Sequence, residues 1–98
     1  MQDITTKIEW ETSAFKKYQT MISKIPLFHR EIAKTVVDKK AVLNARERDA
    51  DQVEEQDIVS AFFSEVPKAF YSLMIRLLDE VGFQYEENGY ASKRSVGK

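Results

Sequence analysis

Cysteine is absent from the 98-residue chain, and glycine and proline are scarce, with three and two residues respectively. The absence of cysteine excludes disulfide bonds, thiolate metal sites and a cysteine nucleophile. So few turn-forming residues argue against an all-β protein and favour a small number of long helices. The length corresponds to one domain with one small hydrophobic core.

Long hydrophobic runs are absent as well. No apolar stretch approaches the roughly 18 residues that are needed to cross a bilayer, and residues 1–10 lack the apolar segment of a signal peptide. We therefore expect a protein with no membrane contact and a cytoplasmic location. The hydrophobic content of 43% and the charged content of 32% are typical of a folded globular domain.

What the sequence does contain is hydrophobic periodicity. Apolar residues recur at steps of three and four, which is the spacing of one helix face. The pattern predicts an all-α, small four-helix domain with a long central helix and a C-terminal amphipathic helix. The expected helices span about residues 12–23, 26–46, 54–64 and 66–81. They form a helical domain at 12–85, between an extended arm at 1–11 and a mobile tail at 86–98.

Local signals predict the helix ends. Thr12 or Ser13 can cap the first helix, because a hydroxyl oxygen accepts a free backbone N–H. Pro26 suits the first turn of the central helix and disfavours the helical conformation in the residue before it. Pro67 marks the start of the last helix in the same way, and Gly82 suits the cap at its C-terminal end.

Apolar rows along the helices predict the core. In the first helix, the expected core residues are Ala14, Phe15, Tyr18, Met21 and Ile22. In the central helix, the main row is Phe28, Ile32, Val36 and Leu43, and the neighbouring row is Ala33, Val37 and Ala41, with Val42 and Ala45 outside the main row. The last helix has an apolar face wider than a small monomer covers. We therefore expect a homodimer that uses part of the set Phe70, Tyr71, Met74, Leu77 and Leu78.

Charges of opposite sign are segregated along the chain. Residues 15–48 hold nine basic and three acidic residues, a net charge of +6, whereas residues 49–88 hold two basic and ten acidic residues, a net charge of −8. Such asymmetry indicates a basic binding face. It equally indicates that two parts of the domain attract each other, within the fold or across a dimer.

Reactive side chains are few. His29 is the only histidine, so it cannot complete a His/Cys zinc site, and we consider it either structural or a ligand contact. Trp10, the only tryptophan, either packs over an end of the bundle or offers an aromatic contact to a ligand or partner. A cluster of acids leads into the third helix and forms its first turn, where the positive end of the helix dipole favours acids: Asp49, Asp51, Glu54, Glu55 and Asp57. No phosphate-binding glycine motif is present, and we expect no catalytic residue, no metal and no cofactor.

A set of short motifs resembles the PCP-reductase-type small domain over about residues 8–62. The matching positions are Trp10, Ala14, Ile25-Pro26-x-Phe28-x-Arg30, Ala45, Val53 and Ile58-Val59. That domain occurs at the C-terminus of the B subunit of light-independent protochlorophyllide reductase, an enzyme of chlorophyll biosynthesis, and in short free-standing proteins. The last helix, at 66–81, has no counterpart there.

The resemblance implies a non-catalytic helical accessory domain that acts on a protein partner. Redox work in that enzyme class depends on iron–sulfur clusters held largely by cysteine, which this chain lacks. The resemblance implies a structural role for the motif residues Trp10, Ile25, Pro26, Phe28 and Arg30.

Two alternatives to an accessory domain stay open. One alternative comes from a resemblance to the end of the long histone-fold helix, its second loop and the start of its last helix. The matching residues, in order, are Arg46 and Arg48, a loop with Val53, and then Asp57-Ile58. This alternative predicts a histone-like nucleic-acid-binding protein, although the isoelectric point of about 5.8 is low for one. The other alternative is a tetrapyrrole-binding protein that uses His29. By itself the chain is more simply a binding protein than an enzyme.

Overall fold

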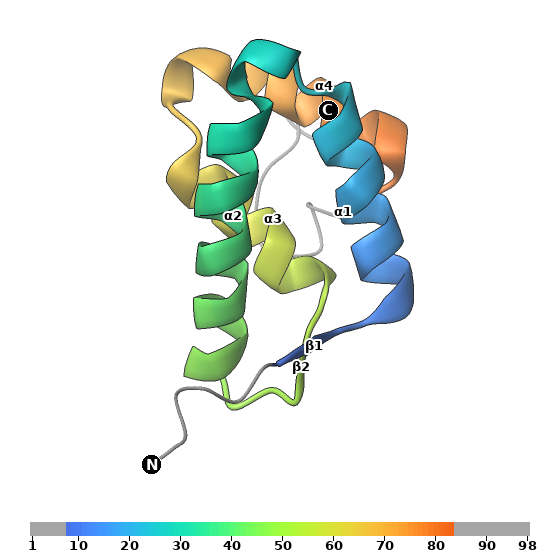
Figure 1. Ribbon diagram of the computed structural model, residues 1–98, viewed down its shortest axis with the longest axis vertical. Coiled ribbons are helices and arrows are strands. Elements are labelled where there is room, and N and C mark those ends of the chain that lie inside the picture. Colours follow the sequence, from blue (N-terminus) through green and yellow to red (C-terminus); the bar gives the residue numbers. More distant parts are fainter. Residues whose placement is uncertain (1–7, 84–98) are drawn as a thin grey trace, which may run out of the picture.

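The computed structural model describes residues 8–83 of the chain, and the expected mobile tail at 86–98 lies outside this range. The described part is a small all-α domain with four α-helices, as predicted, together with one short 3₁₀ turn and two very short strands (Figure 1). In chain order the elements are β1 (Glu9–Trp10), α1 (Thr12–Lys24), α2 (Leu27–Glu47), β2 (Gln52–Val53), α3 (Glu55–Glu65), η1 (Lys68–Phe70) and α4 (Tyr71–Val81).

The first helix begins with a cap that the sequence did not predict. The N-cap is Glu11, whose carboxylate Oε1 accepts the backbone N–H of Ala14 at 2.7 Å. This hydrogen bond favours the charged carboxylate, so it lowers the pKa of Glu11. The Ser13 hydroxyl donates to the same carboxylate at 3.1 Å. The prediction of Thr12 or Ser13 as the cap was wrong, because a longer acidic side chain one residue earlier reaches the free N–H.

The central helix α2 buries the neighbouring row of the prediction and not its main row, so Val37 and Ala41 are confirmed as core residues. Val37, Ala41 and Ala45, spaced by four residues, are fully buried. The main row of the prediction was wrong: Phe28 is 90% exposed, Ile32 69% and Leu43 44%. Among the helices, α2 has its most extensive contacts with α3, and we attribute the choice of row to the small alanine side chains, which let the two helices approach closely.

In α1, by contrast, most of the expected face is buried. Ala14, Tyr18, Met21 and Ile22 belong to the core, whereas Phe15 is 40% exposed. Phe15 instead contacts the edge of Trp10, with 5.6 Å between the ring centroids. The remaining buried core comes from α3, α4 and flanking residues: Val53, Ile58, Val59, Ala61, Phe62, Met74, Leu77, Leu78 and Phe83.

One end of the domain is closed by a parallel strand pair. Glu9 pairs with Gln52 and Trp10 with Val53, and the Glu11 N–H donates to the Val53 carbonyl at 2.8 Å. Figure 1 shows this pair near the bottom of the domain, below α3 and beside the lower end of α2, where it joins the segment before α1 to the α2–α3 loop. The sequence did not predict it, because strands of two residues carry no measurable alternation.

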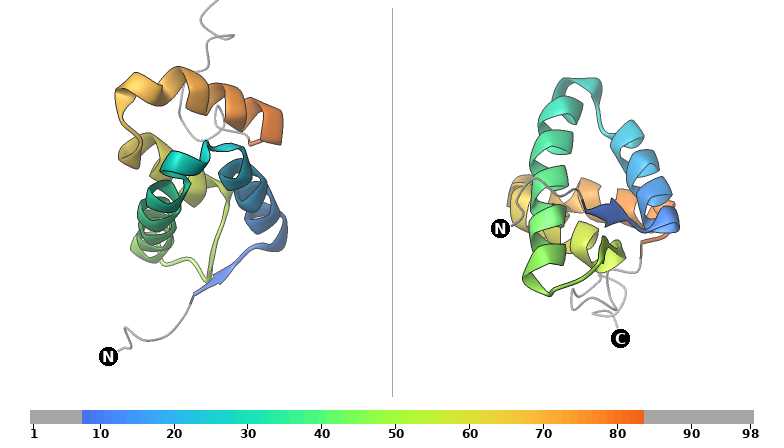
Figure 2. Two further views of the ribbon diagram at one scale, coloured as in Figure 1. Left: turned by 45° about the horizontal axis from the view of Figure 1, so that its top comes forward. Right: turned by 60° about the horizontal axis from the view of Figure 1, so that its bottom comes forward.

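The last helical segment is shorter than expected and begins with the η1 turn. Gly82 adopts a left-handed conformation with φ of 98° and caps α4, as predicted. The axes of α3 and the η1–α4 segment differ by 116°, so α4 turns back across the α1–α2 turn (Figure 2). Over residues 8–83, no single helix is long and apolar enough to cross a membrane.

Candidate functional site

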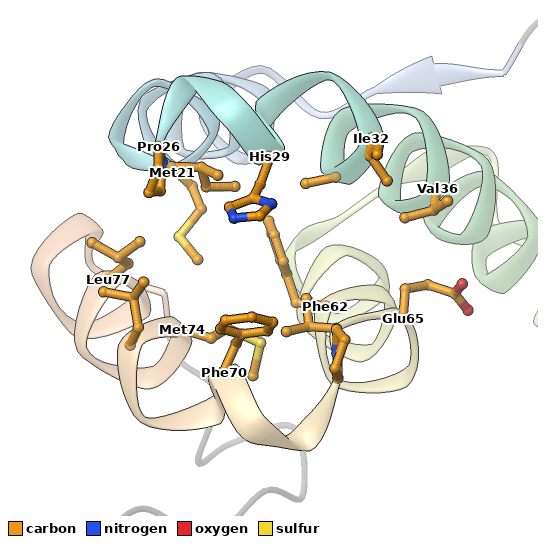
Figure 3. Close-up of a pocket in the computed structure, with 15 residues that line it drawn as sticks. Met21, Pro26, His29, Ile32, Val36, Phe62, Glu65, Phe70, Met74 and Leu77 are labelled. Atoms are coloured by element: carbon orange, nitrogen blue, oxygen red, sulfur yellow. The ribbon is translucent and has the colours of Figure 1, made fainter.

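An apolar pocket with a volume of about 360 Å³ opens where the two helical turns meet (Figure 3). Its volume falls within the range of about 300–1,000 Å³ that is typical of binding pockets. The walls come from the end of α1, the first half of α2, the end of α3 and the η1–α4 segment. The lining residues are Met21, Ile25, Pro26, His29, Ile32, Ala33, Val36, Phe62, Glu65, Val66, Pro67, Phe70, Leu73, Met74 and Leu77.

Two proline-containing turns shape the pocket. Ile25 precedes Pro26 with ψ of 138°, and Val66 precedes Pro67 with ψ of 133°. Proline forces this extended conformation on the residue before it, so each turn ends one helix and redirects the chain. All four residues line the pocket. The two prolines therefore determine where the pocket lies as well as where helices begin.

Arg30 holds the first of these turns. Its Nη2 donates to the carbonyls of Ser23 and Ile25, both at 2.9 Å, and its Nε donates to Ile25 at 3.1 Å. These carbonyls lie at the C-terminal end of α1, where free acceptors and the negative dipole end favour a cation. Within the motif Ile25-Pro26-x-Phe28-x-Arg30, the arginine thus fixes the turn that the proline starts.

Two polar side chains line the otherwise apolar walls: His29 and Glu65. The His29 ring lies 5.7 Å from the Phe28 ring and 6.0 Å from the Phe70 ring, between centroids. Figure 3 shows the imidazole pointing from α2 across the pocket towards Phe70. The two polar residues, His29 and Glu65, are both exposed. A group that entered the pocket would meet hydrocarbon and aromatic surfaces together with one imidazole and one carboxylate.

Large apolar side chains are exposed on the segments that form the pocket: Ile32, Phe70 and Leu73 line it, and Leu27 and Phe28 lie on the first turn of α2 beside Pro26 and His29. Besides Phe28 and Ile32, Leu27 is 76% exposed, Phe70 49% and Leu73 37%. We call these five residues the rim. Soluble monomers rarely leave such side chains clustered around a hollow, and a cluster of this kind marks an interaction site.

The structure separates the predicted motif residues. Ile25, Pro26 and His29 line the pocket, and Phe28 stands at its rim. Trp10 lies at the other end of the domain, where it stacks on Tyr18 with 5.2 Å between centroids and closes the core. This position agrees with the interpretation that Trp10 packs over an end of the bundle.

The residues predicted for a dimer face on the last helix have different positions. Met74, Leu77 and Leu78 are buried within the chain, and the Tyr71 hydroxyl donates to the Phe63 carbonyl. Only Phe70 of this set is well exposed. A face made of all five residues is therefore not available to a second copy, because α4 uses its apolar side to cover the chain's own core.

The segregated charges meet in ion pairs between the two charged halves. Three basic residues of the first half pair with acidic residues of the second: Lys17 with Glu55, Lys24 with Glu80 at 3.6 Å, and Arg48 with Asp57 at 2.8 Å. These pairs agree with the interpretation that two parts of the domain attract each other. They do not test the nucleic-acid-binding alternative, which stays a prediction.

The Arg48–Asp57 pair is the most enclosed of these contacts. Asp57 is 2% exposed and accepts from Arg48 Nε and Nη2, both at 2.8 Å, and from the Glu54 N–H at 2.8 Å. The bonds to Asp57 raise the pKa of Arg48 above its already high value. Asp57, which we expected to favour the start of the third helix, therefore also anchors the α2–α3 loop.

Within residues 8–83, no group of three or more histidine, cysteine, aspartate or glutamate side chains is arranged to hold a metal ion. No protein-family model, curated protein or solved structure matches the chain. The sequence motif predicted the residues of the first turn, but no pattern predicted that Phe62, Leu73 and the Val66-Pro67 turn contribute to the pocket. The two X-Pro steps were visible, but no local signal indicated that the turns meet.

Proposed function

We propose that the protein is a non-catalytic protein-interaction domain, similar in role to the PCP-reductase-type accessory domain, and that the apolar pocket is its binding surface. The observation that supports this proposal is the pocket of about 360 Å³ with five large exposed apolar side chains at its rim. A homodimer, a cytoplasmic location and a connection to chlorophyll biosynthesis belong to the same proposal.

The composition of the pocket favours binding over catalysis. Its lining contains two ionisable side chains, His29 and Glu65, and no serine, threonine, lysine or tyrosine. Nucleophilic catalysis needs a nucleophile and a base within hydrogen-bonding distance. Apolar walls with few polar groups instead suit the burial of apolar side chains from a partner.

The shape of the site suits a helical segment of a partner. An amphipathic helix places apolar anchors at steps of three, four and seven residues and inserts them into a groove. The rim and the pocket together provide apolar surface from α2 on one side and from η1–α4 on the other (Figure 3).

Photo-cross-linking tests the proposal. The cross-linking amino acid p-benzoylphenylalanine is placed at Leu73 on the rim, and at Leu43 as the control, which is exposed on α2 but does not line the pocket. We expect irradiation of producing cells to give a discrete protein adduct from position 73 and none from position 43. Adducts to a nitrogenase-like reductase subunit support the resemblance. Equal adducts from both positions, or none, contradict the proposal.

One observation favours a second candidate function, the binding of a tetrapyrrole. His29 and Phe70 both line the pocket with their ring centroids 6.0 Å apart, so a flat macrocycle would meet an imidazole and an aromatic ring. Titration with haemin is expected to shift the Soret band if this function holds, and His29→Ala should abolish the shift. An unchanged spectrum contradicts it.

A further inference from the structure

We infer that the occupant of the pocket is a second copy of this chain, in a two-fold symmetric dimer where Phe28 of each copy enters the pocket of the other. The inference rests on the proposed function, because it names the partner of the same surface. It differs from a dimer built on the α4 side, whose apolar residues are mostly buried.

The α2 helix offers the kind of surface that an apolar groove accepts. Phe28, Ile32 and Val36 follow one another at steps of four, so they form one stripe along the helix. Phe28 and Ile32 project into solvent, whereas Val36 is half-buried at the pocket wall. Helical segments that bind grooves use anchors with this spacing.

The stripe and the pocket lie on the same face of the molecule. Ile32 and Val36 of the stripe line the pocket, and Phe28 lies one helical turn before Ile32 with its ring 5.7 Å from the ring of His29, which also lines the pocket. A projecting side chain beside a hollow is the arrangement that a two-fold axis makes self-complementary, since each copy supplies what the other accepts.

The exposed apolar area is of the size that a dimer needs. The two phenylalanines of the rim expose roughly 250 Å² together, on a scale of about 150–250 Å² for a whole aromatic side chain. Burying a whole aliphatic side chain stabilises by about 1.5–3 kcal/mol at about 25 cal/mol per Å², which corresponds to about 60–120 Å², so the exposed parts of the three aliphatic rim residues bring the total to roughly 400 Å². A standard interface buries about 800 Å² per partner, of which somewhat more than half is apolar. Rim and pocket wall together therefore supply most of the apolar share.

Charge does not oppose the association. The chain has a formal net charge of −1, and proteins with a net charge near zero do not repel one another strongly. Both signs occur beside the pocket, with Glu65 in its wall and Lys68 one residue after Pro67. The Lys24–Glu80 pair at 3.6 Å joins the end of α1 to α4.

Sedimentation equilibrium of purified full-length protein measures the dimer directly. We expect wild-type protein to change from the 11.4 kDa monomer to twice that mass with rising micromolar concentration. Phe28→Asp removes the projecting side chain without touching the core and should raise the dissociation constant at least about 30-fold, as for an interface hot spot. Leu43→Asp, an equally drastic change on an exposed α2 position, should leave the constant within about twofold.

A mixing experiment tests the reciprocal geometry. Ala33→Phe fills the pocket from its wall and should also abolish the dimer. In a mixture, the Phe28→Asp copy keeps an open pocket and the Ala33→Phe copy keeps Phe28, so one of the two insertions can form and a weak heterodimer should appear. Circular dichroism verifies the fold of each variant. Should Ala33→Phe fail to fold, Leu73→Glu at the rim takes its place.

The outcomes separate this inference from the proposed function. If the wild-type chain stays monomeric and position 73 gives adducts to a different protein, the inference of a second copy as the occupant is wrong, but the proposal that the pocket is a binding surface stands. Monomers without adducts overturn both. A dimer that tolerates Phe28→Asp as well as Leu43→Asp overturns the inference, because the interface then lies on another face.

Discussion

The two ends of this domain differ in what they leave exposed: polar groups are paired at one end, and large apolar side chains are exposed to solvent at the other. We call the end formed by β1, β2 and the α2–α3 loop the closed end. Its backbone polar groups pair between β1 and β2, and the side chains of Arg48 and Asp57 pair with each other. The aromatic ring of Trp10 covers the core there. At the end formed by the two proline turns, the open end, Leu27, Phe28 and Ile32 remain in solvent beside a pocket. One α2 helix connects both ends.

This difference shows that stability and interaction are divided along the length of the molecule. The strand pair and the ion pair of Arg48 with the buried Asp57 carboxylate stabilise the closed end, and losing them destabilises the fold. Exposed apolar side chains at the open end contribute little to folding, because their surroundings are the same in the folded and unfolded chain. Substitutions at the two ends should therefore separate the two properties.

The largest effect is expected at the closed end, for Arg48→Ala. The substitution leaves the Asp57 carboxylate buried with the Glu54 N–H as its remaining donor. We expect the free energy of unfolding to fall by about 3 kcal/mol, near the low end for breaking a buried pair, because Arg48 itself is partly exposed. Urea unfolding followed by circular dichroism measures the change. Lys39→Ala, on the exposed side of α2, is the control and should change it by less than about 0.5 kcal/mol.

A smaller loss is expected where α2 meets α3, for Ala45→Leu. Ala45 is fully buried, so the larger side chain has no room and should cost about 1–3 kcal/mol. The same urea measurement applies. If Ala45→Leu is neutral or stabilising, then the close approach of α2 and α3 does not explain which row is buried.

The Tyr18 hydroxyl links the core to α2 and gives a pH-dependent prediction. It donates to the Asp38 carboxylate, and burial together with this carboxylate raises the pKa of Tyr18 above its ordinary value of about 10. Its contribution to stability is therefore complete below pH 10 and is lost as the pH rises above 10, where only the unfolded chain ionises readily.

Tyr18→Phe should lower the free energy of unfolding by about 1 kcal/mol at neutral pH, which corresponds to one lost hydrogen bond. Above pH 10 the wild-type chain should lose its advantage, so the two urea midpoints should converge. Midpoints that stay equally far apart from pH 8 to pH 11 contradict the assigned link between Tyr18 ionisation and stability.

The smallest effect on stability is expected at the open end, for Ile32→Ser. Because this side chain is mostly in solvent, the free energy of unfolding should change by less than about 0.5 kcal/mol. The substitution should nevertheless lower self-association in sedimentation. A loss above about 1 kcal/mol in monomeric protein would show that the open end also stabilises the fold.

Much of the fold could be predicted from local signals. Pro26 lies immediately before α2, Gly82 caps α4 and the acids before Ile58 lie at the start of α3, each for a reason that acts over one helical turn. The site could be predicted only in part. Ile25, Pro26 and His29 were found from the first turn, but the opposite wall, with Phe62 and Leu73, comes from residues more than thirty positions away.

By itself, the sequence determined the number of helices, their approximate ends and the lack of reactive groups, because these follow from local sequence pattern and composition. The tertiary structure decided which side of α2 is buried. Phe28-Ile32-Val36 and Val37-Ala41-Ala45 both repeat every four residues, and periodicity shows which residues share a side but not which side meets a neighbouring helix. Since α3 packs against the alanine row, the row with the larger side chains remains at the open end, beside the pocket it helps to form.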